Sequence, residues 1–185
     1  AMFGTYQIAA NGVAQSIWSL AALVGSAMGP VFITVIGQCM GAKDVDQAKC
    51  YFSKLIKWSL VFSIVWNVLV LAITPFILQF YNLADETKHL IIILVIIHNI
   101  ANTVVFPLSG PLSQGLRATG DVKFTMIVSI ASTVGGRLVL SIILALGLHL
   151  GVIGIALAMC GDWTIRAIIF YYRYKSNAWT KFEVI

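Results

Sequence analysis

Five long hydrophobic stretches follow one another along the chain, separated by short polar connections. Each is long enough for the ~20 residues that a helix needs to cross the ~30 Å hydrocarbon core of a bilayer. We therefore expect an all-α fold, a polytopic bundle of five membrane-spanning helices without an internal linker. The expected spans are Ile17–Cys39, Leu55–Leu78, His89–Leu112, Phe124–Gly147 and Gly151–Tyr172.

Proline and glycine predict where these helices bend or end. The first stretch extends as one helix over Thr5–Gly41, with Pro30 as a place to kink because proline removes a backbone hydrogen bond. The segment Pro107–Pro111 predicts a bend, and such irregular backbone survives in a membrane only beside protein or a water-filled cavity. The fourth and fifth spans are expected to form a tight hairpin through Gly147–Gly151, and Asn177–Lys181 is expected to be a polar tail.

Basic residues gather on alternate connections, and this gives the bundle a direction. Nine lie on the first, third and final polar stretches, against Lys88 alone on the other two: Lys43, Lys49, Lys54, Lys57, Arg117, Lys123, Arg173, Lys175 and Lys181. The positive-inside rule places the basic stretches in the cytoplasm. We expect an outside N-terminus, a cytoplasmic C-terminus and a multi-pass protein of the plasma or inner membrane.

Composition supports a membrane location and argues against other classes. Hydrophobic residues make up 59% of the 185 residues and charged residues 10%, whereas soluble domains have about 45–50% and ~25%. The net charge is +5, and the basic residues flank the spans. We therefore expect anionic lipid headgroups rather than nucleic acid as their partner. Cys39, Cys50 and Cys160 lack metal-like spacing and are interpreted as small apolar residues without disulfides.

Uncharged polar residues within the spans are candidates for lining a transport cavity, because burying them in hydrocarbon is costly. The first three recur every four residues on one helical stripe, and the last two are one turn apart: Gln7, Asn11, Gln15, Asn67, His98 and Asn102. A cavity lining needs such donors and acceptors. Hydrogen bonding between helices, worth ~0.6 kcal/mol on average, explains them equally well.

Two charged residues within the spans predict an ion pair. Arg137 and Asp162 both lie about 15–16 Å from the turn that joins the fourth and fifth spans, at 1.5 Å per residue. We expect them to pair, directly or through water, because an unpaired charge at the midplane costs ~2.5–3.5 kcal/mol. The pair either holds the hairpin together or lets Asp162 exchange a proton or cation with Arg137 tuning it.

Soluble-type catalysis finds little support. His89, His98 and His149 are not at metal-ligand spacing with acids, and no glycine loop that could cradle a phosphate follows a strand. We expect no enzyme activity, metal or organic cofactor.

Two stretches resemble the multidrug and toxic compound extrusion (MATE) family. Residues 36–44, which include Gly37, Gln38 and Gly41, resemble its "VGQxLGAGD" segment, and residues 115–121 resemble its "LRGxGD" loop. The second resemblance rests on Arg117, Gly120 and Asp121. The segment 151–158 and the final 173–179 follow in the expected order. The likeness covers essentially the whole chain and implies the second to sixth helices of the C-terminal lobe.

The resemblance implies an efflux antiporter of two six-helix lobes that exchanges Na⁺ or H⁺ for small organic cations. The missing N-terminal lobe would then be a partner, and this sequence is expected to be part of a longer transporter. Some relatives carry an acidic cation ligand where this chain has Phe106, and no acid lies between Glu86 and Asp121. We therefore expect the coupling-ion site to lie outside this part.

Two alternatives remain open. A lipid-linked oligosaccharide flippase of the same superfamily would need several cations in its cavity, and Arg137 is the basic residue that we place deep in a span. A non-transporting membrane protein that packs as a structural partner is the other alternative.

Overall fold

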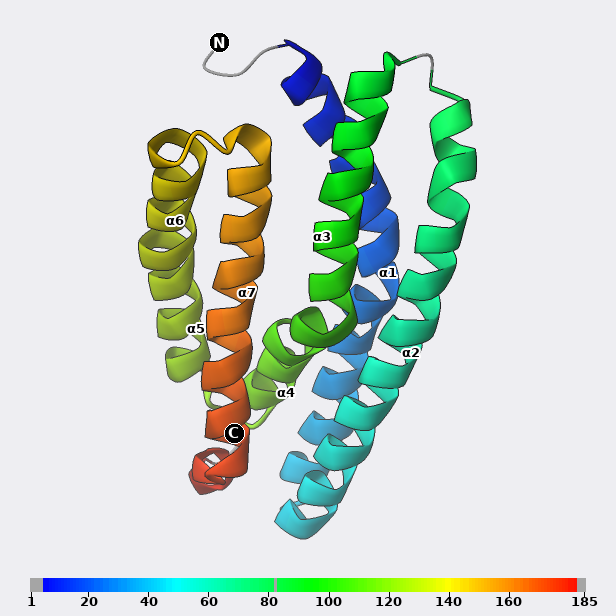
Figure 1. Ribbon diagram of the computed structural model, residues 1–185. Coiled ribbons are helices and arrows are strands. Elements are labelled where there is room, and N and C mark those ends of the chain that lie inside the picture. The colour runs from blue at the N-terminus through cyan, green and yellow to red at the C-terminus, as the bar shows by residue number, and fades with distance from the viewer. Residues whose placement is uncertain (1–4, 82, 183–185) are drawn as a thin grey trace.

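The computed structural model describes residues 5–81 and 83–182, and these residues form helices and turns without a strand, as Figure 1 shows. The all-α expectation is therefore confirmed. Four helices account for most of the bundle: α1 (Thr5–Gly41), α2 (Val45–Gln79), α3 (Asp85–Ser109) and α7 (Gly151–Lys175). The fourth crossing is assembled from α5 (Val122–Ala131), η1 (Ser132–Leu138), α6 (Val139–Ile142) and η2 (Ile143–Gly147).

Five helical segments of the described chain are long and apolar enough to cross a membrane, which confirms the expected number. They extend beyond the predicted spans: Tyr6–Gly41, Val45–Gln79, Asp85–Ala118, Val122–Gly147 and Gly151–Lys175. The first is one continuous helix through Pro30, as predicted. Its 37 residues correspond to roughly 55 Å at 1.5 Å per residue, so both ends project beyond the hydrocarbon core.

The third crossing breaks where its prolines predict. Helix α3 ends at Ser109, and α4 (Pro111–Ala118) begins after Gly110, whose φ of −88° and ψ of −79° separate the two helices. Pro111 supplies no backbone N–H but suits the first turn of α4, where such a donor has no helical partner. Figure 1 shows α4 leaving the axis of α3 and crossing beside α1.

The core lies where α1, α2 and α3 pack together and α7 joins them. Small residues of α1, including Ala10 and Ala14, are fully buried against Ile91 and Leu94 of α3. Their size lets the helix backbones approach closely, the usual basis of helix packing in a bilayer. The fourth crossing packs mainly on the opposite side of α7, so α7 lies between two groups of helices (Figure 1).

The fourth crossing is not a continuous α-helix. Segments η1 and η2 have π-helical hydrogen bonds, which add a residue to each turn and redirect the side chains that follow. Little of the fourth crossing is buried within the described chain. The predicted hairpin to α7 is present, with left-handed backbone at His149 (φ 55°) and Gly151 (φ 57°).

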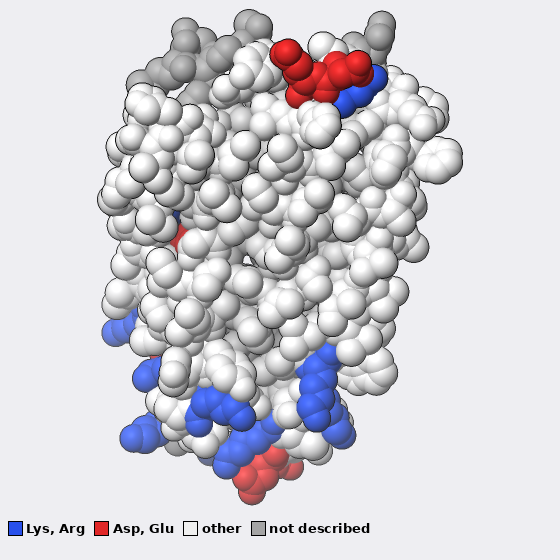
Figure 2. Space-filling view, in the orientation of Figure 1, with Lys and Arg blue, Asp and Glu red and all other residues white. Residues whose placement is uncertain are grey.

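Basic residues gather at one end of the molecule. Figure 2 shows lysines and arginines around the lower end, a largely uncharged middle, and a small group of mixed charge at the upper end. The helix order places the first, third and final polar stretches at that lower end. We call it the basic end, and it bears out the prediction that these stretches share one side.

The expected polar tail is wrong, because its tryptophan is part of the core. Residues Ala178–Lys181 form the short 3-10 turn η3, and Trp179 is fully buried. Its ring lies 4.8 Å from that of Phe52 between centroids, and its Nε1 donates to the carbonyl of Tyr174 at 3.1 Å. The chain therefore closes on the basic end of the bundle.

Candidate functional site

Aromatic rings from three helices meet at mid-depth in the bundle. Trp18 of α1 stacks on Trp163 of α7 at 5.7 Å between ring centroids, and Phe106 of α3 meets Trp163 edge-on at 5.4 Å. The ring of His98 lies 6.4 Å from that of Trp18. We call these four residues the aromatic cluster. It joins α1, α3 and α7 and includes His98, one of the six predicted cavity residues.

Two buried asparagines of α2 and α3 bond to their own helices. Asn67 Nδ2 donates to the carbonyl of Ser63 at 2.8 Å, and Asn99 Nδ2 donates to that of Val95 at 3.1 Å. The buried amide of Asn102 makes no hydrogen bond within the described chain. Within the described chain, Asn67, His98 and Asn102 therefore make no direct hydrogen bond to another helix.

The buried atoms left over are mainly acceptors. His98 Nδ1 lies 2.8 Å from the carbonyl of Leu94 and must donate to it, because a carbonyl only accepts. In the neutral ring Nε2 is then an acceptor, and it has no partner among the described residues. The same holds for Oδ1 of Asn67, Asn99 and Asn102. Buried polar atoms normally find partners, so an unsatisfied group of this kind indicates a place for a ligand or water.

The stripe at the start of α1 lies apart from these residues. Gln7 donates to the hydroxyl of Tyr6 at 3.1 Å, and its Oε1 faces Gly151 at the hairpin. Asn11 and Gln15 are half-buried. Within the described chain, no hydrogen bond connects Gln7, Asn11 or Gln15 to the polar residues of α2 and α3.

Arg137 and Asp162 do not form the direct ion pair that the sequence predicts. Asp162 is fully buried and forms its ion pair with Arg166, one turn farther along α7, and it accepts a hydrogen bond from Ser132 of η1. Arg137 instead donates to the Sδ of Met159 at 3.0 Å. Arg137 lies opposite Met159 and Asp162 lies opposite Ser132, so the two charges differ in depth by about one helical turn.

Arg166 is not among the site residues predicted from the sequence, although it lies within the fifth span. Its spacing from Asp162 is the i, i+4 arrangement that brings opposite charges together on one helix face. Thioether sulfur is a weak acceptor, so Arg137 is the less well satisfied of the two guanidinium groups. The middle of the bundle therefore holds one neutralised pair and one arginine whose partner within the described chain is uncharged.

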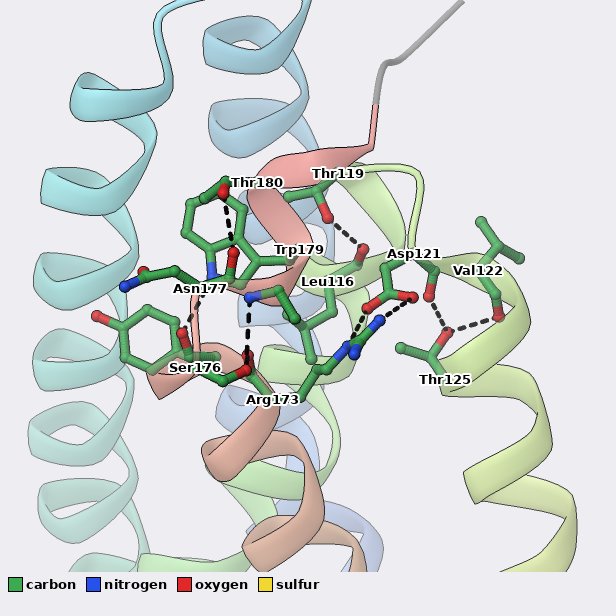
Figure 3. Close-up of polar contacts among 12 residues, drawn as sticks. Leu116, Thr119, Asp121, Val122, Thr125, Arg173, Ser176, Asn177, Trp179 and Thr180 are labelled. Atoms are coloured by element: carbon green, nitrogen blue, oxygen red, sulfur yellow. Dashed lines mark hydrogen bonds and ion pairs between the residues drawn. The ribbon is translucent and has the colours of Figure 1, made fainter.

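At the basic end, Asp121 of the second motif contacts Arg173 of α7, as Figure 3 shows. Asp121 is 2% exposed and accepts from Arg173 Nε at 2.7 Å and Nη2 at 3.3 Å. Gly120 has a φ of 93°, a left-handed conformation that favours glycine. Arg117 Nε donates to Thr125 Oγ1 at 3.3 Å. The loop of residues 115–121 thus fastens the third and fourth crossings to the end of α7.

The first motif stretch contributes to the same end. Ile36, Cys39 and Met40 pack in one hydrophobic group with Phe52 and Trp179. The carbonyl of Gln38 accepts from Ala42 as α1 ends, while Gly37 and Gly41 have open space where a Cβ would project. The stretches 36–44, 115–121 and 173–179 therefore meet in space, although they lie far apart in the sequence.

Comparison with known proteins decides the family. The MatE family model matches residues 1–143. The chain belongs to the MatE family. It is also similar to the "Uncharacterized transporter YisQ" of Bacillus subtilis (strain 168), with 25% identity over 97% of this chain. The chain spans 39% of the length of that relative, and no solved structure gives a significant match.

Membership of the MatE family makes this a multi-pass membrane protein of a transporter family. The described residues contain no group of three or more histidine, cysteine, aspartate or glutamate side chains placed to hold a metal ion. The arrangement offers ring faces, amide oxygens and one arginine as binding groups. Mostly apolar surfaces with a few polar groups are typical of reversible binding sites.

Proposed function

We propose that this chain is the second to sixth helices of the C-terminal lobe of a MATE-type antiporter, which exports small organic cations in exchange for Na⁺ or H⁺. The observation that carries the proposal is the MatE family match. The aromatic cluster supports the substrate class, because ring faces attract cations. The lobes would rock about a central cleft and move the substrate across the membrane.

The basic end is proposed to face the cytoplasm, together with the C-terminus. The positive-inside rule supports this orientation. Figure 2 shows the lysines and arginines gathered at that end. Anionic lipid headgroups are the proposed partners of this end.

The coupling ion is proposed to bind outside this part of the transporter. Phe106 offers no carboxylate, and the buried carboxylate of Asp162 is already paired with Arg166 and hydrogen-bonded to Ser132. A carboxylate held in this way stabilises packing between α7 and η1, and releasing it would leave Arg166 without a counter-charge. We therefore assign Asp162 a structural role in the lobe.

Ethidium transport by the full-length protein in liposomes tests the proposal. Dye should move against its gradient when an inwardly directed Na⁺ or H⁺ gradient is imposed, and the effective gradient identifies the ion. Vesicles without a gradient, and vesicles whose gradient has been dissipated by an ionophore, serve as controls. An absence of transport under both gradients contradicts the antiporter and favours a structural role.

A lipid-linked oligosaccharide flippase is the second candidate. Arg166 adds a second arginine within the spans, but Asp162 neutralises it, so Arg137 remains the group suited to a pyrophosphate. Scrambling of a pyrophosphate-linked lipid in the same liposomes, without ethidium transport, would favour this candidate.

A further inference from the structure

A hydrophobic groove of about 350 Å³ lies on the surface where α1 and α2 pack side by side, as Figure 1 shows. Nearly all of its lining comes from one face of α2: Val24, Val61, Phe62, Val65, Trp66 and Leu69. The Nε1 of Trp66 donates to the carbonyl of Leu20 in α1 at 2.7 Å. This bond satisfies the polar atom of the indole and fixes the ring across both helices, so the groove is a preformed apolar surface.

Two rows of side chains connect the groove to the basic end. Side chains four residues apart lie on the same face of a helix, one turn above each other. The rows are Lys57, Val61, Val65 and Leu69, and beside them Lys54, Trp58, Phe62 and Trp66. The ring of Trp58 stacks on that of Phe62 at 5.4 Å between centroids, which makes the second row continuous. Each row therefore begins with a lysine and ends in the groove.

The two lysines that begin these rows are available to an anion. Lys54 and Lys57 are exposed, and neither forms a salt bridge within the described chain. Lys49, one turn nearer the end, is instead paired with Asp46 at 3.2 Å. Long lysine side chains extend their ammonium groups toward the headgroup level. Exposed tryptophans such as Trp58 are typical of that same interface.

The length of the rows matches one leaflet of a bilayer. The twelve-residue separation of Lys57 and Leu69 corresponds to roughly 18 Å along the helix at 1.5 Å per residue. Half of a hydrocarbon core of ~30 Å is ~15 Å. A headgroup at the level of Lys57 thus places its acyl chain along the whole groove.

We propose that this groove binds one anionic phospholipid, whose acyl chain lies in the groove and whose phosphate contacts Lys54 and Lys57. The hydrophobic lining suits a hydrocarbon chain, and the lysines supply the complementary charge for the phosphate. A transmembrane helix in the same place would cover the groove without neutralising the lysines. The proposal rests on the lipid partnership proposed for the basic end, and it does not depend on the transported solute.

Native mass spectrometry of the purified full-length protein tests the headgroup contact. The protein is titrated with phosphatidylglycerol, or with phosphatidylcholine that has the same acyl chains. Each lysine should contribute about 5-fold, so wild type should bind phosphatidylglycerol roughly 30-fold more tightly. Lys54→Gln/Lys57→Gln should abolish this preference and leave the affinity for phosphatidylcholine unchanged. Lys123→Gln/Lys175→Gln is the matched control, because it removes two lysines from the same end on α5 and α7.

Filling the groove tests the acyl-chain contact. Val65→Phe should weaken the binding of both lipids at least ~4-fold, the equivalent of one displaced CH₂ group. Val68→Phe is the matched control on the same helix. Val65 and Val68 are 62% and 63% exposed, but only Val65 is among the residues that line the groove.

Thermal unfolding midpoints establish that each variant is folded before it is titrated. An undiminished preference for phosphatidylglycerol in Lys54→Gln/Lys57→Gln overturns the headgroup contact, and equal affinities of Val65→Phe and Val68→Phe overturn the groove. A wild-type protein that retains neither lipid also overturns the proposal and means that another part of the transporter covers this face. Ethidium transport is measured separately, so transport without lipid binding leaves the antiporter standing, and lipid binding without transport leaves the groove standing.

Discussion

Asp162→Asn is the sharpest test of the polar network between α7 and η1. Asp162 is fully buried, pairs with Arg166 and accepts from Ser132. Asparagine keeps the size of the side chain and can still accept from Ser132. It removes the negative charge, however, and leaves the Arg166 guanidinium, whose side chain is 19% exposed, without a counter-charge in the span.

The expected loss is about 3 kcal/mol. Removing one partner of a buried ion pair costs ~3–5 kcal/mol, and an uncompensated arginine at the bilayer centre costs ~2.5–3.5 kcal/mol on insertion scales. Arg166 lies about 6 Å nearer the basic end than Asp162 and can extend toward it, which favours the lower values. For a unit of this size, that loss lowers the unfolding midpoint by roughly 6–12 °C.

A thiol-reactive fluorogenic dye measures the midpoint in detergent, because Cys39 is buried and Cys160 partly buried in the folded protein. In the full-length protein, adding Arg166→Leu to Asp162→Asn should restore most of the stability, since an apolar residue replaces the stranded charge. Adding Arg137→Leu should not. Rescue by Arg137→Leu alone, or an unchanged midpoint in Asp162→Asn, would refute the pairing described for α7.

Three further predictions concern packing and orientation. Trp179→Ala should lower the free energy of unfolding by about 3–5 kcal/mol, which is typical of a large aromatic lost from a core. The dye assay should show this loss as a lower unfolding midpoint. A midpoint within error of wild type would mean that the C-terminal turn is not docked. Gly154→Ala should destabilise the protein by roughly 1–3 kcal/mol, because its Cβ would lie 2.7 Å from the backbone of η2. Gly135→Ala, which has open space around it, should be neutral. Equal effects of the two substitutions on the midpoint would contradict the packing of the hairpin. The exposed Cys50, kept as the single cysteine, should react with a membrane-impermeant maleimide only in inside-out vesicles; labelling of intact cells would reverse the orientation.

The number and order of the crossings could be predicted well because the bilayer constrains them strongly. Hydropathy and length define the crossings, and the break at Pro107–Pro111 and the turn at Gly147–Gly151 follow from backbone chemistry alone. The positive-inside pattern likewise places the basic stretches at a common end. These features depend on residues near one another in the chain, so the sequence contains the whole signal.

Side-chain partners could not be predicted as well because they depend on rotation about each helix axis. The π-helical turns of η1 redirect Arg137 toward Met159, and nothing in the apolar pattern indicates them. Trp179 contacts Phe52, which lies far from it in the sequence. No local pattern indicates such a contact. Arg166 is different, since its i, i+4 spacing from Asp162 was visible and would have identified the pair.

The position of α7 has a mechanical consequence. Within a single turn, Met159 and Asp162 contact Arg137 and Ser132 of the fourth crossing, while Trp163 touches the rings on α1 and α3. At that depth the described residues offer no comparable second bridge between the fourth crossing and the other helices. Because the fourth crossing packs along much of α7, a displacement of that crossing would reach the stacked indoles through α7.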